Sequence, residues 1–333
     1  MKIPPYRKAI SEALRQEMQR DRRVVLIGQD IGLGGGAFGI TKGFLKEFGK
    51  ERVIDAPLTE SGFIGAALGM AMMGLHPVAE LQYSDFVTNA FKMLVDYAAN
   101  HYYHHQVNVP VTVRLPAGAL NSSSAFHSHN PEGWFFHVPG LKIVAAASPG
   151  DVKGLLPAAI RDSNPVLFLE YKRLYNLPLH HFPEPLREEV PKEPGGLSLG
   201  KGRVIREGED LTLVTYGSTV LESLEAAALA AEEDGLEVEV IDLRSIRPFD
   251  KELILESVGK TGRALMVHED HLTGGVGAEL AAFVAREAFE SLDAPLLRVG
   301  SLDTPIPFHP ALEKTFLPTT EKILAAVRRL AEY

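Results

Sequence analysis

An uncharged stretch that directly follows one carboxylate constrains the fold of this chain most. The stretch lies within residues 58–74, LTESGFIGAALGMAMMG, and Glu60 stands ahead of its uncharged part. Apolar side chains fall on every side of a helix drawn through it, which predicts a helix buried all round. A glycine inside a helix costs roughly 1 kcal/mol relative to alanine. The recurring glycines therefore indicate that another backbone or a flat ligand approaches the helix closely.

Glu60 is expected at the positive end of this helix, at the entrance to a dry site. Burial and the helix dipole have opposite effects on the charge of a carboxylate, and this competition is common where a carboxylate handles protons. An ordinary first-turn glutamate that accepts hydrogen bonds from helix N–H groups explains the same pattern. The stretch alone leaves both interpretations open.

The length and charge of the chain limit its class. With 333 residues it exceeds most single cores, which predicts two domains. Its net charge of -9 argues against nucleic acid as the main partner, because phosphate binding needs clustered Lys and Arg. The sequence contains no cysteine, which excludes disulfides, a thiol nucleophile and Cys-based zinc sites and suits a cytoplasmic protein. We expect no secretory signal and no membrane span, because the apolar runs are too short.

Strand and helix patterns alternate along the whole chain. Strands are expected at 24–27, 76–83, 109–115, 141–147, 166–171, 211–216, 236–243, 264–268 and 296–299, and helices at 6–18, 58–74, 86–100, 151–161, 221–233, 251–258, 276–292 and 319–333. This alternation predicts an α/β fold whose parallel sheets are covered by helices. We expect a doubly wound parallel-sheet domain over 1–175, a proline-rich linker over 176–200 and a smaller α/β domain over 201–333.

Open α/β sheets bind ligands beyond the carboxyl ends of their strands. Three such loops carry polar or aromatic residues. Glu60 follows a short strand around 53–54, Tyr83, Asp85 and Phe86 come at the end of the strand that carries Gln82, and His127 and His129 lie in the loop after the third strand. We expect these residues to form one site. Solvated loop histidines are the alternative for the two imidazoles, although histidine is the side chain most suited to move protons near neutral pH.

Other motifs support chemistry less well. His101, His104 and His105 have metal-like spacing but lack the glutamate of the zinc-protease helix, so a solvated or interface face is favoured. His268 and His271 end a strand, where capping or packing explains them. The glycine-dense segment 28–44 fits neither the dinucleotide nor the Walker spacing and is interpreted as a flexible surface loop. No GxSxG elbow surrounds the serines at 122–124, so serine hydrolysis has little support.

Several long stretches, in the same order, resemble the beta subunit of the thiamine-diphosphate-dependent decarboxylating component of 2-oxo acid dehydrogenase complexes. They are VIDAPLTESGFIGAALGMA, PVAELQYSDF, FHSHNPEGWFFHVPGLKIV, AAIRDSNPVLFLEYKRLY, DLTLVTYG, VIDLRSIRPFD and LDTPIPFHP. The resemblance implies a pyrimidine-binding domain followed by a transketolase C-terminal-like domain. The alternation of strands and helices agrees with this fold independently.

The resemblance implies roles for the residues of the expected site. Glu60 matches the glutamate that hydrogen-bonds N1′ of the aminopyrimidine of thiamine diphosphate and so helps its amino group act as a base. Leu58, Gln82 and Phe86 match positions beside the pyrimidine, with Phe86 where tyrosine is often found. His127 matches the histidine thought to assist acyl transfer to a lipoyl group. The chemistry belongs to the cofactor, and the protein supplies a dry, oriented pocket.

Two departures from the family pattern affect proton handling. His129 stands where glutamine is common, which leaves open whether it or His127 serves acyl transfer. Gln29 stands where glutamate is usual in an acidic path between two active sites, which puts such communication in doubt. The resemblance also implies a potassium site formed mostly by backbone oxygens, at the positions of Val111, Thr112, Ala159, Asp162 and Asn164.

The chain lacks the GDG motif through which this class of enzyme holds the diphosphate and magnesium. An alpha subunit is therefore expected to hold them in a two-alpha, two-beta heterotetramer, with a lipoyl-bearing acyltransferase as a further partner. We expect a branched-chain 2-oxo acid dehydrogenase, with pyruvate or acetoin as other substrates that fit. A self-contained transketolase-like enzyme and a non-catalytic scaffold that binds a partner are the alternatives.

Overall fold

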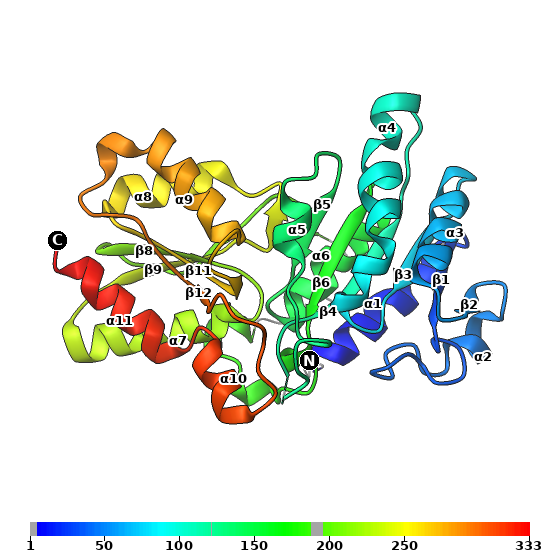
Figure 1. Cartoon of the computed structure of the whole chain (residues 1–333), viewed down its shortest axis with the longest axis horizontal. Coiled ribbons are helices and arrows are strands. Elements are labelled where there is room, and N and C mark those ends of the chain that lie inside the picture. Colours follow the sequence, from blue (N-terminus) through cyan, green and yellow to red (C-terminus); the bar gives the residue numbers. More distant parts are fainter. Residues whose placement is uncertain (1–4, 121, 188–195) are drawn as a thin grey trace.

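Two β-sheets with helices packed against them lie side by side in the computed structural model (Figure 1), which describes residues 5–120, 122–187 and 196–333. Within these residues the first sheet has the strand order β10-β5-β6-β4-β3-β1-β2 and the second the order β12-β11-β8-β9-β7. The strands are β1 (Val24–Gln29), β2 (Val53–Ala56), β3 (His76–Glu80), β4 (Thr112–Ala117), β5 (Lys142–Ala145), β6 (Val166–Tyr171), β7 (Arg203–Arg206), β8 (Leu211–Thr215), β9 (Val238–Asp242), β10 (Ser245–Arg247), β11 (Ala264–His271) and β12 (Leu297–Ser301).

Parallel pairing dominates both sheets, as the alternation of strands and helices predicts. In the first sheet β1 pairs in parallel with β2 and β3, and β4 with β3 and β6. Strands β4 and β6 are buried along their whole length, because helices or the second unit cover both faces. The carboxyl ends of β1 to β4 therefore meet at one edge of the first unit.

The helices of the first unit are α1 (Tyr6–Arg20), α2 (Phe44–Phe48), α3 (Glu60–Met72), α4 (Ala99–His105), α5 (Glu132–Phe136) and α6 (Pro149–Arg161). Helices α1 and α6 pack against each other, and the hydroxyl of Tyr6 donates to the carbonyl of Ala146 at 2.9 Å. The helix expected over 86–100 is in fact three pieces: a 3-10 helix at Ser84–Ala90, a π-helical segment at Met93–Ala98 and then α4. Such irregular helices are common at functional sites.

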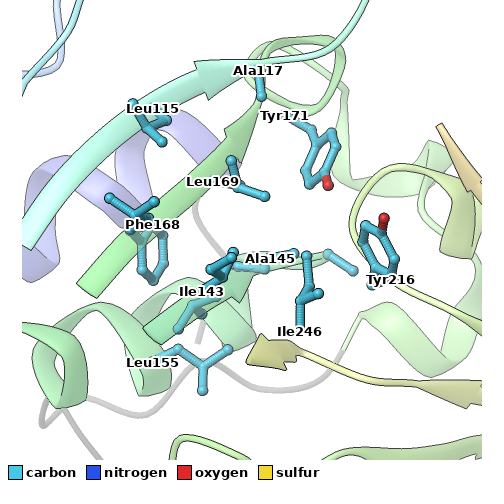
Figure 2. Packing of buried hydrophobic residues seen from close by; sticks show 14 of the residues in the cluster. Leu115, Ala117, Ile143, Ala145, Leu155, Phe168, Leu169, Tyr171, Tyr216 and Ile246 are labelled. Atoms are coloured by element: carbon cyan, nitrogen blue, oxygen red, sulfur yellow. The ribbon is translucent and has the colours of Figure 1, made fainter. Parts of the chain in front are cut away.

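The second unit contains α7 (Thr219–Asp234), α8 (Lys251–Thr261), α9 (Val276–Glu287), α10 (Pro310–Phe316) and α11 (Thr320–Ala331). Its strand β10 leaves this unit and pairs antiparallel with β5 at the edge of the first sheet. Figure 2 shows the result: Ile246 of β10 lies beside Ala145 of the first unit, and Tyr216 of the second unit lies across from Tyr171 of β6. The apolar core therefore runs from one unit into the other.

Helix α3 is covered on one side only, which corrects the prediction that this stretch is buried all round. Phe63, Ile64, Ala67, Leu68 and Ala71 are buried. The opposite side carries exposed small residues at positions 62, 66 and 69, and Met73 just beyond the helix is 85% exposed. This chain alone therefore leaves a strip of the helix in contact with solvent.

Two further expectations concern the connections. Residues 176–200 contain short helical turns at Leu179–His181 and Glu184–Leu186, and residues 188–195 of the expected linker lie outside the described part. The division at 175 and 201 remains a prediction. No helix in the described residues is both long and apolar enough to cross a bilayer.

Candidate active site

The loops that follow β1 to β4 bring the expected site residues to one edge of the first sheet. Glu60 begins α3 after β2, Gln82 and Phe86 follow β3, and the loop 119–130 after β4 carries both histidines. This arrangement agrees with the rule that α/β sheets place their ligand sites beyond the carboxyl ends of the strands.

Glu60 is buried at the start of α3, with 8% of its surface exposed. Asn89, from the 3-10 helix after β3, donates from Nδ2 to Glu60 Oε2 at 3.2 Å. The first turn of the helix stabilises a negative charge at this position. Leu58, two residues earlier, is 71% exposed although its side chain is apolar. A largely buried carboxylate thus lies close in the chain to an uncovered apolar surface.

Aromatic rings gather where β3 ends. The ring centroid of His127 lies 4.4 Å from that of Tyr83 and 5.7 Å from that of Phe86, and both pairs are edge-to-face. Tyr83 and Phe86 also contact each other edge-to-face at 5.8 Å. The loop histidine is therefore packed against aromatic rings, and the alternative of a fully solvated His127 does not describe its surroundings.

His129 is held differently, by a carboxylate that the sequence did not single out as a partner. Its Nδ1 lies 2.6 Å from Asp85 Oδ1, and the same oxygen accepts from the backbone N–H groups of Ser128 and His129 at 3.2 Å. The hydroxyl of Ser84 donates to the His129 carbonyl at 2.7 Å. A carboxylate that orients one ring nitrogen leaves the other for proton transfer.

Carboxylates of the second unit also hold the loop 119–130. Glu269 Oε1 accepts from the backbone N–H of Ala119 at 2.7 Å and from Asn130 Nδ2 at 3.3 Å. Glu313 accepts from the backbone N–H of Ser122 through both oxygens, at 3.2 and 3.1 Å. Ser122 and Ser124 have positive φ values, a backbone strain that persists only where the surroundings fix it. The loop that presents the two histidines is therefore fixed by both units.

A buried lysine lies beside the aromatic rings. Lys172 Nζ donates to the carbonyl of Gly118 at 2.5 Å and lies 5.6 Å from the ring centroid of Tyr83. Burial lowers the pKa of Lys172 to about 8, and the carboxylates of Asp85, Glu269 and Glu313 oppose that shift. Sequence analysis missed Lys172, and it placed Asp85 near the site without its partner His129, because each residue meets its partners only in the folded chain.

Acidic groups accumulate in the seam behind the loop, where the first unit meets the second. Burial raises the pKa of Glu132 well above its ordinary value, and the nearby Asp270 adds to the shift. Burial also raises the pKa of Asp270 to about 6. The hydroxyl of Tyr216 donates to Glu132 Oε1 at 3.2 Å, and Glu132 Oε2 is a buried oxygen without a partner in the described residues.

The remaining polar candidates have structural contacts. Gln82 Nε2 donates to Asp30 Oδ2 at 3.0 Å, and Gln29 ends β1. His268 is buried with Nδ1 3.1 Å from the carbonyl oxygen of Asp270, and burial lowers its pKa to about 4, which keeps the ring neutral. His271 Nδ1 lies 2.8 Å from the carbonyl oxygen of Leu302. No group of three His, Asp or Glu side chains in the described residues has metal-binding geometry.

The five residues expected around a potassium ion lie where α6 ends and where β4 and β6 begin. The carbonyl of Ala159 accepts from the backbone N–H of Asp162 at 3.2 Å, and that of Val111 accepts from Val166 N–H at 2.9 Å. Asp162 Oδ1 accepts from the backbone N–H of Asn164 at 2.9 Å, and Lys142 Nζ donates to Asp162 Oδ2 at 2.5 Å. Thr112 is the first residue of β4. Several of these oxygens thus already have protein donors.

The glycine-dense segment after β1 is held by hydrogen bonds within the segment. Gly36 N–H donates to the carbonyl of Asp30 at 2.9 Å, and the hydroxyl of Thr41 donates to the carbonyl of Ile31 at 2.7 Å. A side chain at position 36 would meet the carboxylate of Glu80, which explains the glycine there. That carboxylate and Glu170 both pair with the fully buried Arg114.

Comparison with known proteins shows two family models that together match most of the chain. "Transketolase, pyrimidine binding domain" matches residues 3–178 and "Transketolase, C-terminal domain" matches residues 200–323. A solved structure described as "Split gene transketolase, inactive beta4 tetramer" has the same fold, with a TM-score of 0.79, 23% identity and 98% of both chains covered.

Curated relatives match over the full length. The chain is 42% identical to the 2-oxoisovalerate dehydrogenase subunit beta of Bacillus subtilis, covering 100% of both chains. It is also 42% identical to the pyruvate dehydrogenase E1 component subunit beta of Staphylococcus epidermidis, covering 98% of both chains. Relatives with two different named substrates therefore match this chain at equal identity.

Proposed function

The chain belongs to the thiamine-diphosphate-dependent family of 2-oxo acid dehydrogenase beta subunits, and from this premise we propose how its residues serve that reaction. Glu60 is the residue that activates the cofactor. The observation that carries this assignment is a largely buried carboxylate at a helix N-terminus, held by Asn89, near the exposed apolar side chain of Leu58. An apolar surface beside a dry carboxylate fits the aminopyrimidine ring.

Thiamine diphosphate, when bound, supplies the nucleophile that releases carbon dioxide from a 2-oxo acid. The carboxylate of Glu60 holds a proton at N1′ of the pyrimidine and so fixes the tautomer. Leu58 and Phe86 offer apolar contacts to the ring, and Gln82 a polar one. The Asn89 amide holds Glu60 in position, because its hydrogen bond restricts the rotation of that carboxylate.

The loop 119–130 serves the second half of the reaction, in which an acyl group passes to a lipoyl arm of an acyltransferase partner. The edge-to-face contacts of His127 with Tyr83 and Phe86, beside the proposed pyrimidine site, support this role. We assign acyl transfer to His127 and a supporting role to the Asp85–His129 pair. General acid–base catalysis of this kind contributes typically a hundredfold to ten-thousandfold, in order of magnitude.

This chain supplies one half of each active site. We propose that an alpha subunit binds the diphosphate and magnesium and assembles with this chain as a two-alpha, two-beta heterotetramer in the cytoplasm. The strip of small residues on α3 that this chain leaves uncovered supports such an assembly. We favour a branched-chain 2-oxo acid as substrate, with pyruvate or acetoin as alternatives that direct turnover assays of the assembled enzyme would distinguish.

We also propose that the carbonyl-rich corner formed by Val111, Thr112, Ala159, Asp162 and Asn164 binds potassium. The carbonyl oxygens of Val111 and Ala159 each accept one backbone hydrogen bond, and the second lone pair of each oxygen is a suitable ligand for a hard cation. The thermal unfolding midpoint should then be higher in potassium than in sodium at equal ionic strength. Equal midpoints in the two salts would contradict the assignment.

The substitution Glu60→Gln in the assembled enzyme tests the proposed function. It keeps the shape of the side chain and removes its basic oxygen, so turnover should fall roughly a hundredfold or more. Size-exclusion chromatography should show an intact assembly. Glu51→Gln, which changes an exposed glutamate of the same unit, should keep full turnover. Wild-type turnover of Glu60→Gln would show that this glutamate only caps its helix.

A further inference from the structure

A cavity of about 710 Å³ lies in the seam between the two units, away from the candidate active site. Its lining in the first unit includes Lys142, the first residue of β5, and Asn164, shortly before β6. Its lining in the second unit includes Arg247 at the end of β10, the residues that follow it and side chains of α9. It therefore opens near the amino ends of β5 and β6, whereas the candidate active site lies beyond the carboxyl ends of β2 to β4. Its volume is that of a small-molecule site, and such sites are common at domain boundaries.

Three phenylalanine rings form an apolar wall of this seam cavity. The rings of Phe136 and Phe249 are stacked with centroids 6.4 Å apart and planes at 19°. Phe249 contacts Phe283 edge-to-face at 5.2 Å. The wall contains rings from α5, α9 and the segment that follows β10. A flat or acyl group would find an aromatic surface here that is already built.

The polar lining is strongly positive although the chain as a whole carries a net charge of -9. Lys142, Arg247, Lys251 and Arg286 line the cavity together with one acidic residue, Glu279. Two of the cations are paired, Lys142 with Asp162 and Arg286 with Glu287.

The other two cations have no carboxylate partner in the described residues. The Lys251 ammonium lies over the rings of Phe249 and Phe283, at 5.9 and 5.7 Å from their centroids. The Arg247 guanidinium lies 5.7 Å from the centroid of Phe136 and donates through one nitrogen to the carbonyl of that residue. The other N–H groups of this guanidinium have no partner in the described residues. Two uncompensated cations beside an aromatic wall predict a ligand with one anionic group and one apolar group.

We propose that the seam cavity binds a small amphipathic organic anion, an aromatic or acyl group that ends in a carboxylate, phosphate or sulfonate. The anionic group pairs with Lys251 and Arg247, and the apolar group packs on the three phenylalanine rings. Because the cavity has walls from both units, such a ligand links them. The site is independent of the proposed thiamine diphosphate chemistry.

Fluorescence titration with 1-anilinonaphthalene-8-sulfonate, an aromatic anion, tests the proposal on the beta chain assembled with its alpha subunit. One site per beta chain is expected. N-phenyl-1-naphthylamine has the same rings without the sulfonate and should bind more weakly. Phenyl phosphate should displace the sulfonate probe better than inorganic phosphate does. Equal displacement by phenyl phosphate and inorganic phosphate would show that the phenylalanine wall does not contribute to binding, and it would contradict the proposal.

Variants separate charge from packing. Lys251→Gln changes an exposed side chain and should weaken binding of the sulfonate probe roughly tenfold, the value of one charge-assisted hydrogen bond. It should leave the neutral probe unaffected, and Lys251→Arg should restore the affinity for the sulfonate. Lys50→Gln, an exposed lysine of the first unit, should change nothing.

Two results would overturn the proposal. Unchanged affinity of Lys251→Gln for the sulfonate probe would show that the probe binds elsewhere. Binding to the isolated beta chain but not to the assembled enzyme would show that the partner subunit covers the cavity. Arg247→Gln provides a second charge variant, and a thermal unfolding scan identifies any loss of folding at this more buried position.

Discussion

Two histidines of one loop differ in what holds their rings. Aromatic rings surround His127, whereas Asp85 orients His129. The sequence predicted both imidazoles and left the choice between them open. The sequence could not decide between the two histidines. Asp85 and the aromatic rings lie at the end of β3, about forty residues from the loop along the chain, and they meet the histidines only in the fold.

His127→Ala should therefore spare decarboxylation measured with an artificial electron acceptor and impair acyl transfer to the lipoyl arm. The reason lies in the proposed roles, in which an imidazole moves the proton at the lipoyl sulfur and Glu60 serves the first step. His129→Ala is the matched variant. If His129→Ala loses acyl transfer and His127→Ala keeps it, the imidazole oriented by Asp85 is the catalytic one, and our assignment is wrong.

Short elements were the least predictable from the sequence. The long buried strands and amphipathic helices follow from local periodicity, so β4, β6 and α11 lie close to where the pattern placed them. Strand β10 has three residues, and its place in the first sheet depends on β5, about one hundred residues earlier. The 3-10 and π segments at 84–98 look helical in sequence, but both pack against α3, and Asp85 of the 3-10 segment accepts from the loop 119–130, which the sequence did not show.

The loop 119–130 depends on anchors from the second unit. Glu269 is buried and accepts from the backbone of Ala119 and from Asn130. Glu269→Gln replaces charge-assisted hydrogen bonds with neutral ones. Each charge-assisted bond contributes roughly 1.5–3 kcal/mol to stability. A protease should then cleave the loop faster under limited proteolysis. The rate of acyl transfer should fall more than the rate of decarboxylation.

Glu279→Gln is the control for this prediction, because Glu279 is an exposed carboxylate on α9. It should leave proteolysis of the loop unchanged. A positioning role for Glu269 also predicts that acyl transfer falls in kcat with little change in KM for the 2-oxo acid. Equal losses of both activities would indicate a general loss of folding instead.

At the scale of the whole molecule, charged groups connect the two units. Asp151 of α6 accepts from Arg244 Nε at 2.8 Å and from Arg203 at 3.2 Å, and Asp242 of β9 lies 3.7 Å from Arg203. Burial and the nearby Asp151 raise the pKa of Asp242 from 3.8 to about 7. Such a shift makes the stability of the fold depend on pH.

The sign of this dependence follows from proton binding. Between the two pKa values the folded chain retains a proton on Asp242 that the unfolded chain has lost, so stability falls as the pH rises toward about 7. Asp242→Asn removes this dependence. The free energy of unfolding of the variant, relative to that of wild type, should therefore increase as the pH rises from about 5 to about 8. Chemical denaturation at each pH measures this difference. Asp96→Asn, at an exposed site, should show the wild-type profile. A constant difference between Asp242→Asn and wild type across this range would contradict the prediction.

The uncovered side of α3 is the feature of the whole molecule that this chain alone does not explain. A side chain built at Gly69 meets nothing within 4 Å, so the glycine serves no contact in the described part of the chain. Glycine at this position costs roughly 1 kcal/mol of helix stability relative to alanine. A partner backbone that packs closely on this strip would account for that cost.

Gly69→Leu should then affect the isolated chain and the assembly in opposite ways. Leucine is a good helix former, so the isolated beta chain should keep or gain stability, by up to roughly 1 kcal/mol. The same side chain should prevent close packing and abolish co-purification with the alpha subunit. Gly259→Leu makes the same exchange at an exposed helical glycine of α8, where a side chain also meets nothing within 4 Å, and should leave assembly intact. Normal assembly of Gly69→Leu would show that this strip faces solvent in the complete enzyme, and the glycines of α3 would need another explanation.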